Sequence, residues 1–278
     1  PVCEVRDLAA PATVMGDLAT AVAGAADGAT LQVRGTCAAA SAVTIDGPLT
    51  IVGKKTAALG APTLTTTAVG PRILNVHPGA ADDVVTLRGL RLTGSTETSD
   101  QSGGAIIVLT GTLVLRDVRI DDVEAQSGGA IFVDGGASLV MAGTTAIRNA
   151  RAAWGGGVYV AAGARLTMRD RASIAYSHAV KGGGAIEGDE GTPGSTIILR
   201  DDASIHHNTT DGYGAAINTG GTMLLRDRAT IHDNDGTAAT DAANAAFGSA
   251  VEIWSYTTTV TRLTLRGDAA IRGNVADA

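Results

Sequence analysis

The feature that most restricts the fold of this sequence is a four-residue motif that recurs along most of the chain. The motif is a Gly-Gly pair followed by Ala or Gly and then by Ile or Val. Its copies begin at Gly103, Gly128, Gly155 and Gly183, and two weaker copies begin at Gly214 and Gly248. Successive starts are 25 to 34 residues apart, by subtraction of these numbers. A motif that returns every 20 to 50 residues indicates a stacked repeat architecture.

Each repeat carries two further marks. The first is an alternating apolar segment that ends in Arg followed by Asp or Gly, as in residues 113–117. The second is Ile-x-x-Asn, which begins at Ile205, Ile231 and Ile271. Strict alternation over about five residues is typical of strands. We therefore expect three short strands per repeat, separated by Gly, Asp or Asn, with no crossover helix between them.

Repeats of this size must bury the apolar face of their strands against one another. The simplest arrangement is a coil in which like strands stack in parallel at about 4.8 Å. The sequence thus predicts an all-β, right-handed parallel β-helix of about nine turns, forming one continuous domain over residues 29–278. The paired glycines suit corners where backbones crowd. The Asn of Ile-x-x-Asn is placed to bond its equivalents in neighbouring turns.

The Gly-Gly-Ala-Ile copy at Gly183 and the Ile-x-x-Asn copy at Ile205 together resemble the repeats of chlamydial polymorphic outer-membrane protein passengers, which carry Phe in place of this Ile. A wider resemblance, over residues 29–278, is to secreted bacterial right-handed β-helix proteins of the pectate-lyase-like superfamily. The resemblance implies a β-helix that is secreted or displayed at the cell surface. It leaves the activity open, because that class holds lyases, hydrolases, adhesins and stalks.

Residues 1–28 are predicted to form an extended lead-in and an N-terminal capping helix. The helix is expected from Thr13 to about Ala26, with one apolar face made of Val14, Leu18, Ala21, Val22 and Ala25. A cap is needed because the open end of a solenoid exposes core and unpaired strand edges. Cys3 and Cys37 bracket the first turn, and we expect a disulfide, the alternative being two buried thiols. A disulfide would imply an exported protein.

Composition narrows the partners. The net charge of −7 argues against a nucleic-acid partner. No apolar run approaches the roughly 18 residues of a membrane span. Aromatic residues make up only 3% of the chain, which argues against a processive polysaccharide enzyme. Trp154, directly before one glycine pair, is a candidate platform for a single sugar.

The first candidate surface is a ladder of arginines at one place in the repeat. Its members are Arg116, Arg169, Arg200 and Arg226, with Arg88 and Arg266 at the same place nearer the two ends. Stacked guanidinium groups suit an acidic polymer, because their forked donors match carboxylate and sulfate. However, Asp117, Asp170, Asp201 and Asp227 follow four of them directly. The alternative is therefore a self-neutralised Arg/Asp surface.

The second candidate is a His/Asp cluster on neighbouring turns. Alignment on Ile205 and Ile231 places His206 beside His232 and His207 beside Asp233, and Asp211 and Tyr213 are expected close by. Such groups perform acid–base catalysis or bind metals. The alternative is a solvated stack of polar turns, and no recognised metal motif is present. Pairs of Asp such as Asp121-Asp122 leave calcium open, and no other cofactor is expected.

These observations favour a non-catalytic secreted or cell-surface β-helix module, adhesin-like or structural, that contacts glycans. The alternative is a polysaccharide lyase or glycoside hydrolase acting at the His206, His207 and Asp233 face. Insertions lengthen two turns, at residues 187–195 and 235–246. A groove beside them lined by Asp or His would favour the enzyme, and a flat, self-paired face would favour the binding module. End-to-end self-association through the C-terminal turn is a third hypothesis.

Overall fold

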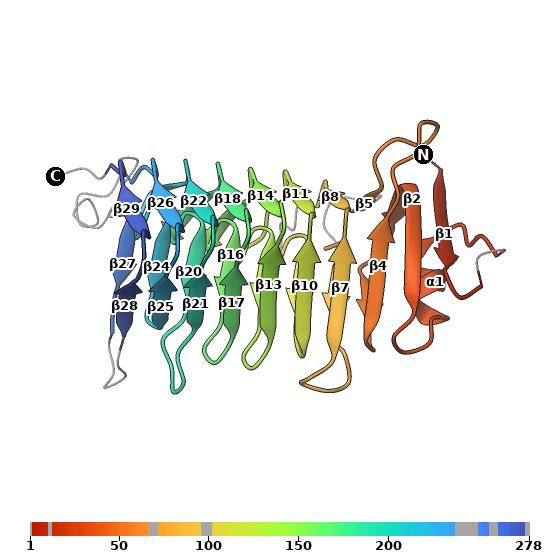
Figure 1. Cartoon of the computed structure of the whole chain (residues 1–278), viewed down its shortest axis with the longest axis horizontal. Coiled ribbons are helices and arrows are strands. Elements are labelled where there is room, and N and C mark those ends of the chain that lie inside the picture. The colour runs from red at the N-terminus through yellow and green to blue at the C-terminus, as the bar shows by residue number, and fades with distance from the viewer. Residues whose placement is uncertain are drawn as a thin grey trace.

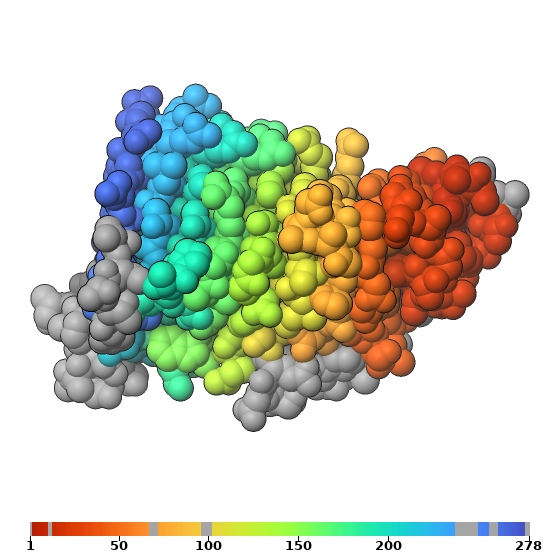
Figure 2. Space-filling view, turned by 90° about the horizontal axis from the view of Figure 1, so that it is seen from below, coloured from red at the N-terminus to blue at the C-terminus, as the bar shows by residue number. Residues whose placement is uncertain are grey.

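The computed structural model describes residues 2–10, 13–66, 72–95, 102–236, 250–255 and 261–275. Its strands coil around one long axis, with the N-terminal segment at one end and the last turns at the other (Figure 1). In the space-filling view the turns follow one another along this axis in sequence order (Figure 2). The prediction of an all-β, parallel β-solenoid is confirmed.

Three long ladders of parallel strands make up the coil. The first ladder contains β2 (Thr30–Ala39), β4 (Leu49–Gly53), β7 (Val84–Arg88), β10 (Thr112–Arg116), β13 (Ser138–Ala142), β17 (Arg165–Met168), β21 (Thr196–Leu199), β25 (Thr222–Leu225) and β28 (Arg262–Leu265). The second ladder starts in the later half of β2 and continues through β5 (Thr63–Thr66), β8 (Arg91–Thr93), β11 (Arg119–Asp121), β14 (Ala146–Arg148), β18 (Ser173–Ala175), β22 (Ser204–His206), β26 (Thr230–His232) and β29 (Ala270–Arg272). The third ladder contains β3 (Val43–Ile45), β6 (Leu74–Val76), β9 (Ile106–Val108), β12 (Ile131–Val133), β16 (Val158–Val160), β20 (Ile186–Gly188), β24 (Ile217–Thr219) and β27 (Val251–Ile253).

The coil makes about seven turns. The prediction of nine was too high, because a strand copy at each end of a ladder does not by itself complete a turn. Residues 237–246 of the second insertion, and Gly248 of the last weak motif copy, lie outside the described residues.

The core is a set of apolar columns that run along the coil axis. In the first ladder Leu115 stands in register between Leu87 and Met141, and all three side chains are fully buried. Because strands repeat at about 4.8 Å, each side chain contacts its equivalents above and below. Full burial of one such side chain contributes about 1.5–3 kcal/mol. The apolar periodicity of the repeat thus becomes the continuous core of the solenoid.

The two glycines of each motif have different structural roles. Gly155 has a φ of 63°, in the left-handed region, and turns the chain into the third ladder. Gly156 has an ordinary φ, but a Cβ placed on it would lie 2.3 Å from the carbonyl oxygen of Gly184 in the next turn. The first glycine therefore makes the corner, and the second lets neighbouring turns approach.

A fourth, short ladder was not predicted from the sequence. It contains β15 (Arg151–Trp154), β19 (His178–Gly182) and β23 (Thr209–Thr210), which pair in parallel. These segments lack apolar alternation, so the sequence pattern did not mark them as strands. The fourth ladder directly precedes the glycine corner and holds Trp154 beside it.

The N-terminal segment differs from the expectation in its details. The helix α1 spans only Leu18–Ala23, not Thr13 to Ala26, and its N-cap is Asp17, whose side chain accepts a hydrogen bond from the Thr20 amide at 2.7 Å. The helix starts late because Met15 forms a β-bridge with Val5. Its Leu18 and Ala21 side chains join the core.

Ahead of the helix, β1 (Cys3–Asp7) pairs antiparallel with β2 and so covers the outer edge of the first ladder. The expected disulfide is confirmed between Cys3 and Cys37, whose Cα atoms are 4.6 Å apart. The bond attaches β1 to the first turn. A disulfide is typical of an oxidising, extracytoplasmic environment.

Candidate ligand-binding site

The aspartates that follow the arginine ladder have a structural role. Asp170, Asp201 and Asp227 adopt left-handed φ angles between 58° and 62° at the corner between the first and second ladders. Each carboxylate accepts a backbone N–H from the preceding turn: Gly143 donates to Asp170 at 2.8 Å, Asp170 to Asp201 at 3.1 Å, and Asp201 to Asp227 at 3.2 Å. These aspartates connect successive turns.

The arginines are paired with these same aspartates. Nitrogen–oxygen distances are 3.8 Å for Arg169–Asp170, 3.5 Å for Arg200–Asp201 and 3.8 Å for Arg226–Asp227. Arg116 stands in register with Arg88 and contributes to the lowered pKa of Asp117, of which a hydrogen bond from the Thr144 backbone is the main cause. This geometry supports the self-neutralised alternative for the Arg ladder.

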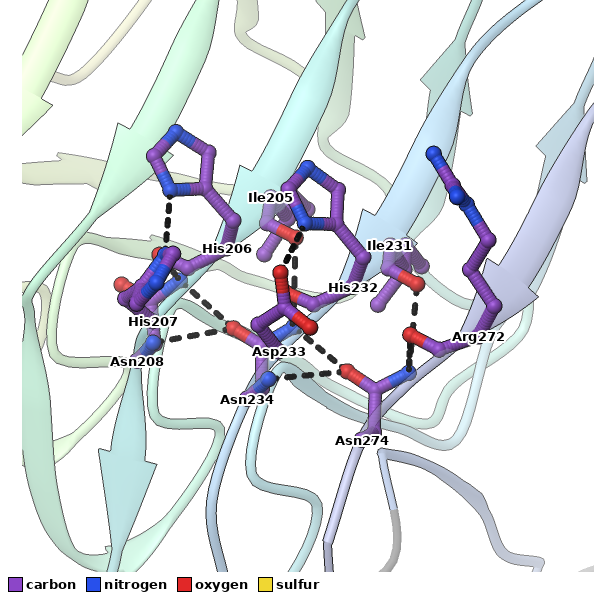
Figure 3. Close-up of polar contacts among 10 residues, drawn as sticks. All are labelled: Ile205, His206, His207, Asn208, Ile231, His232, Asp233, Asn234, Arg272 and Asn274. Atoms are coloured by element: carbon purple, nitrogen blue, oxygen red, sulfur yellow. Dashed lines mark hydrogen bonds and ion pairs between the residues drawn. The ribbon is translucent and has the colours of Figure 1, made fainter.

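The structure brings four residues of the predicted His/Asp cluster together on the outer face of the second ladder (Figure 3). The rings of His206 and His232 stack with centroids 5.1 Å apart. The two Nδ1 atoms of His206 and His207 are 2.9 Å apart, and His232 Nδ1 lies 2.8 Å from Asp233 Oδ2. Partial burial, with smaller effects from His232 and His207, lowers the pKa of His206 to about 4, so its ring is neutral at pH 7.

Beneath this face lies the expected asparagine ladder, formed by Asn208, Asn234 and Asn274 (Figure 3). Asn208 donates to Asn234 Oδ1 at 2.9 Å, and Asn234 donates to Asn274 Oδ1 at 2.8 Å. The His/Asp face is therefore a self-paired surface over a structural ladder, as the solvated-turn alternative requires.

Asp211 and Tyr213 contact other groups. Asp211 Oδ2 lies 3.5 Å from Nε2 of His178 on the fourth ladder, and Tyr213 forms a β-bridge with Gly182. Within the described ranges, no group of three or more His, Cys, Asp or Glu residues is arranged to hold a metal ion.

A pocket of about 260 Å³ lies at the edge of the third ladder, beside the first insertion. We call it the Glu187 pocket. Its aromatic lining residues are Trp154, Tyr159, Tyr213 and Trp254, and its polar lining residues are Glu187, Asp189, Asn218 and Glu252. Tyr159, Glu187, Asn218 and Glu252 come from one outward column of the third ladder, in register on successive strands. Trp154 comes from the fourth ladder, so the pocket forms where two ladders meet across the glycine corner.

Glu187 is the most unusual ionisable group in the pocket. Its residue is only 3% exposed, its Oε1 accepts a hydrogen bond from Asn218 at 2.9 Å, and its buried Oε2 has no hydrogen-bond partner among the described residues. Burial raises the pKa of Glu187 well above its ordinary value, and the nearby carboxyl groups of Asp189 and Glu252 raise it further. The pocket therefore holds a carboxyl group that favours its neutral form.

The other two carboxyl groups share this environment. Burial raises the pKa of Asp189, against the effect of the Tyr159 hydroxyl, which donates to Asp189 Oδ1 at 2.5 Å. Burial also raises the pKa of Glu252, and its Oε2 is buried without a hydrogen-bond partner among the described residues. Three carboxyl groups thus lie in one partly buried pocket. None of the lining residues that the structure describes carries a positive charge.

Sequence reasoning found only Trp154 and Tyr213 of this pocket. A usable signal was present in the residue that follows each motif, which reads Ile107, Phe132, Tyr159, Glu187, Asn218 and Glu252 along the chain. The change from apolar and aromatic residues to carboxylates and an amide marks the column where the pocket lies. The burial of the pocket, which decides its chemistry, depends on Trp154 of the fourth ladder. The residues that follow the motif do not indicate that contact.

Replacement of Glu187 by glutamine is expected to flatten the pH dependence of stability. Because the folded-state pKa of Glu187 is raised, the folded protein keeps a proton that the unfolded chain releases. The unfolding free energy of the wild type therefore falls as pH rises from about 4.5 through the folded pKa, by up to ~1.4 kcal/mol per pH unit for this proton. Urea unfolding at several pH values measures the slope.

The Glu187→Gln variant keeps an acceptor for Asn218 and has no carboxyl group to ionise. The exposed Glu124 offers a matched control, and Glu124→Gln should leave the slope unchanged. Identical pH profiles for wild type and Glu187→Gln would contradict the assignment of this carboxyl group.

The chain matches no protein-family model, no curated protein and no solved structure. Its resemblance to the pectate-lyase-like and chlamydial groups therefore depends on the repeat pattern alone. No helix in the described part of the chain is long and apolar enough to cross a membrane. The structure shows a parallel β-solenoid of repeating turns, with a Cys3–Cys37 disulfide that joins β1 to the first turn.

Proposed function

We propose that this chain is a non-catalytic, extracytoplasmic β-solenoid module, adhesin-like in its role, that binds saccharides in the Glu187 pocket. The observation that carries the proposal is the combination of four aromatic rings with buried carboxyl and amide groups in one cavity. Sugars present apolar ring faces that pack on aromatic side chains and hydroxyl groups that hydrogen-bond to carboxyl and amide oxygens. The Cys3–Cys37 disulfide supports a secreted or surface location.

The other two candidate surfaces are less suited to binding a ligand than the Glu187 pocket. The arginine ladder and the His/Asp face use their charges on their own neighbours. In the Glu187 pocket, by contrast, Oε2 of Glu187 and Oε2 of Glu252 lack partners among the described residues. Buried polar atoms without partners are costly in a folded protein, and a ligand hydroxyl group satisfies them.

The test is a titration with a panel of neutral and acidic oligosaccharides. The chain has two tryptophans, Trp154 and Trp254, and both line the pocket, so intrinsic tryptophan fluorescence reports on this site. In calorimetric titrations, Trp154→Ala should weaken binding by about tenfold or more. Tyr176→Ala, which removes an exposed aromatic ring beside the His/Asp face, is the matched control and should bind normally. Equal affinities in both variants would move the site away from this pocket.

A second candidate function is cleavage of a glycosidic bond in the same pocket. One observation that favours it is the presence of several carboxyl groups with raised pKa values, because glycoside hydrolysis needs one carboxyl group as acid and another as base or nucleophile. The other is the position of the pocket beside the first insertion with Asp189 in its lining, which is the arrangement expected to favour an enzyme. These carboxyl groups favour Glu187 over the predicted His206, His207 and Asp233 face as the centre of such chemistry.

A depolymerisation screen decides between binding and cleavage. The protein is incubated with polysaccharides, with and without calcium, and assayed for new reducing ends and unsaturated products. Cleavage that Glu187→Gln abolishes and His207→Ala retains would establish an enzyme at the pocket. Cleavage lost only in His207→Ala would place it on the His/Asp face. No products, from a protein that melts cooperatively, would support the non-catalytic proposal.

A further inference from the structure

The charges around the Glu187 pocket restrict its ligand further. Building on the saccharide-binding proposal, we infer that the ligand carries an organic ammonium group, as a protonated amino sugar does, and that this group sits between the aromatic rings and the carboxyl groups of Glu187 and Glu252. The inference depends on the proposed function for the sugar part of the ligand. The positive charge of the ligand is inferred from the residues of the pocket alone.

The aromatic wall is suited to a cation. Trp154, Tyr159, Tyr213 and Trp254 all line the same cavity of about 260 Å³, which is the size of a small ligand group rather than a long groove. The negative face of an aromatic ring attracts an ammonium group, and several rings around one site are typical of quaternary ammonium recognition. The Trp154 ring already contacts a cation, because Lys181 Nζ lies 5.6 Å from its centroid.

The charge balance of the lining points the same way. Three carboxyl groups line the pocket, from Glu187, Asp189 and Glu252, and none of the described lining residues is Lys, Arg or His. Lys181 lies against Trp154 and is not part of that lining. A neutral sugar would satisfy hydrogen bonds, but only a cation would also stabilise the ionised form of these three carboxyl groups.

Two glutamate oxygen atoms in the pocket could accept hydrogen bonds from the ammonium group. Oε2 of Glu187 and Oε2 of Glu252 are both buried and both lack a hydrogen-bond partner among the described residues. Their strands, β20 and β27, are separated by β24, so their Cα atoms are about 10 Å apart at the usual strand spacing. An ammonium group between them has several N–H donors, and charge-assisted hydrogen bonds to carboxylates are roughly twice as strong as neutral ones.

Ligand binding should therefore release protons. The ionisable groups near Glu187 are Asp189, Glu252 and, through its bond to Asp189, the Tyr159 hydroxyl. Asn218 donates a hydrogen bond to Glu187, and Lys181 lies over the Trp154 ring. In the empty pocket, burial keeps the pKa of Glu187 high, so this carboxyl group holds a proton. A cation favours its ionised form, and the affinity for a fixed cation should rise with pH.

The experiment uses two ligands that differ only in charge. Short β-1,4-linked glucosamine oligomers carry protonated amines below the amine pKa, whereas the N-acetylated oligomers of the same length are neutral. Calorimetry on the whole chain should show about tenfold or more tighter binding of the glucosamine oligomer. Repetition in buffers of different ionisation enthalpy should show proton release with the charged ligand only. Choline forms a third arm, because its charge is fixed and it has no sugar part.

Variants test the assignment of the receiving group. Glu187→Gln should reduce affinity for the glucosamine oligomer by about tenfold or more and leave the acetylated oligomer within about twofold. Glu124→Gln, which changes an exposed glutamate outside the pocket lining, should change neither. Circular dichroism and a cooperative melt establish that each variant is folded. The comparison of the two oligomers on the wild-type protein needs no variant, so a folding defect in Glu187→Gln leaves the inference testable.

Each outcome has one meaning. Equal affinity for charged and neutral oligomers overturns the ammonium inference and leaves saccharide binding standing. Binding of choline without either sugar supports the ammonium site and overturns the saccharide function. Binding of none of the three ligands overturns both.

Discussion

Gly156→Ala is expected to lower the free energy of unfolding by about 3 kcal/mol or more, the largest effect we predict for a single methyl group. A Cβ at this position would lie 2.3 Å from the Gly184 carbonyl oxygen, 2.6 Å from the His178 carbonyl oxygen and 2.8 Å from the His178 carbonyl carbon. All three are main-chain atoms of the next turn, so no side chain can rotate away. The Gly156 amide donates to the Gly183 carbonyl at 3.0 Å, which prevents a local shift without loss of that bond.

Urea unfolding followed by circular dichroism measures this effect. Gly79→Ala is the matched control, because the nearest atom to its Cβ would be the Asp46 carbonyl oxygen at 4.0 Å. Its cost should stay within about 0.5 kcal/mol. The restriction varies between turns, since Ala215 occupies the same place in the copy after Gly184. A Gly156→Ala protein with the wild-type urea midpoint would show that the turns can separate at little cost.

Asn234→Ala is expected to cost about 3–5 kcal/mol, because it removes the middle rung of a buried ladder. The Asn234 residue is fully buried. Its Oδ1 accepts from both the backbone and side-chain nitrogens of Asn208, each at 2.9 Å, and its Nδ2 donates to the carbonyls of Ile205 and His232. Alanine would leave these buried groups without their hydrogen-bond partners.

Equilibrium unfolding of single and double variants tests the ladder as a unit. Asn208→Ala combined with Asn234→Ala should cost less than the sum of the single changes, since both remove the same bonds. Asn75→Ala, in which a strand asparagine loses only a 3.4 Å contact from its Nδ2 to Thr44 Oγ1, is the control and should cost within about 0.5 kcal/mol. Strict additivity of the two ladder variants would argue that the asparagines act independently.

Much of the architecture could be predicted because a solenoid places each repeat directly on the next. Residues at the same place in the repeat must then be neighbours, so the pairing of His206 with His232 and the contact of Asn208 with Asn234 followed from alignment alone. The Cys3–Cys37 bond followed from two cysteines that bracket one turn. The first two contacts join residues at equivalent positions of neighbouring repeats. The disulfide joins the two cysteines of the chain.

The features that the sequence did not predict depend on contacts between positions that are not equivalent in the repeat. The helix begins at Leu18 rather than Thr13 because Met15 is bound to Val5 in a bridge that local helix propensity cannot register. The fourth ladder, including β15, lacks an alternating pattern, since it is a short connection with main-chain pairing and little inward surface. Asp211 was expected close to His206 and His232, and alignment on the repeat did not predict the contact that it makes with His178 of the fourth ladder.

By itself, the sequence determined the coil, the columns of equivalent residues and the asparagine ladder, because translation from one repeat to the next fixes which copies of a position stack. Only the tertiary structure decided which different positions in the repeat converge. The left-handed corner at Gly155 brings Trp154 of the fourth ladder against the outward column that contains Glu187. That convergence removes Glu187 from water, and burial, rather than residue type, sets its protonation and makes the pocket a candidate site.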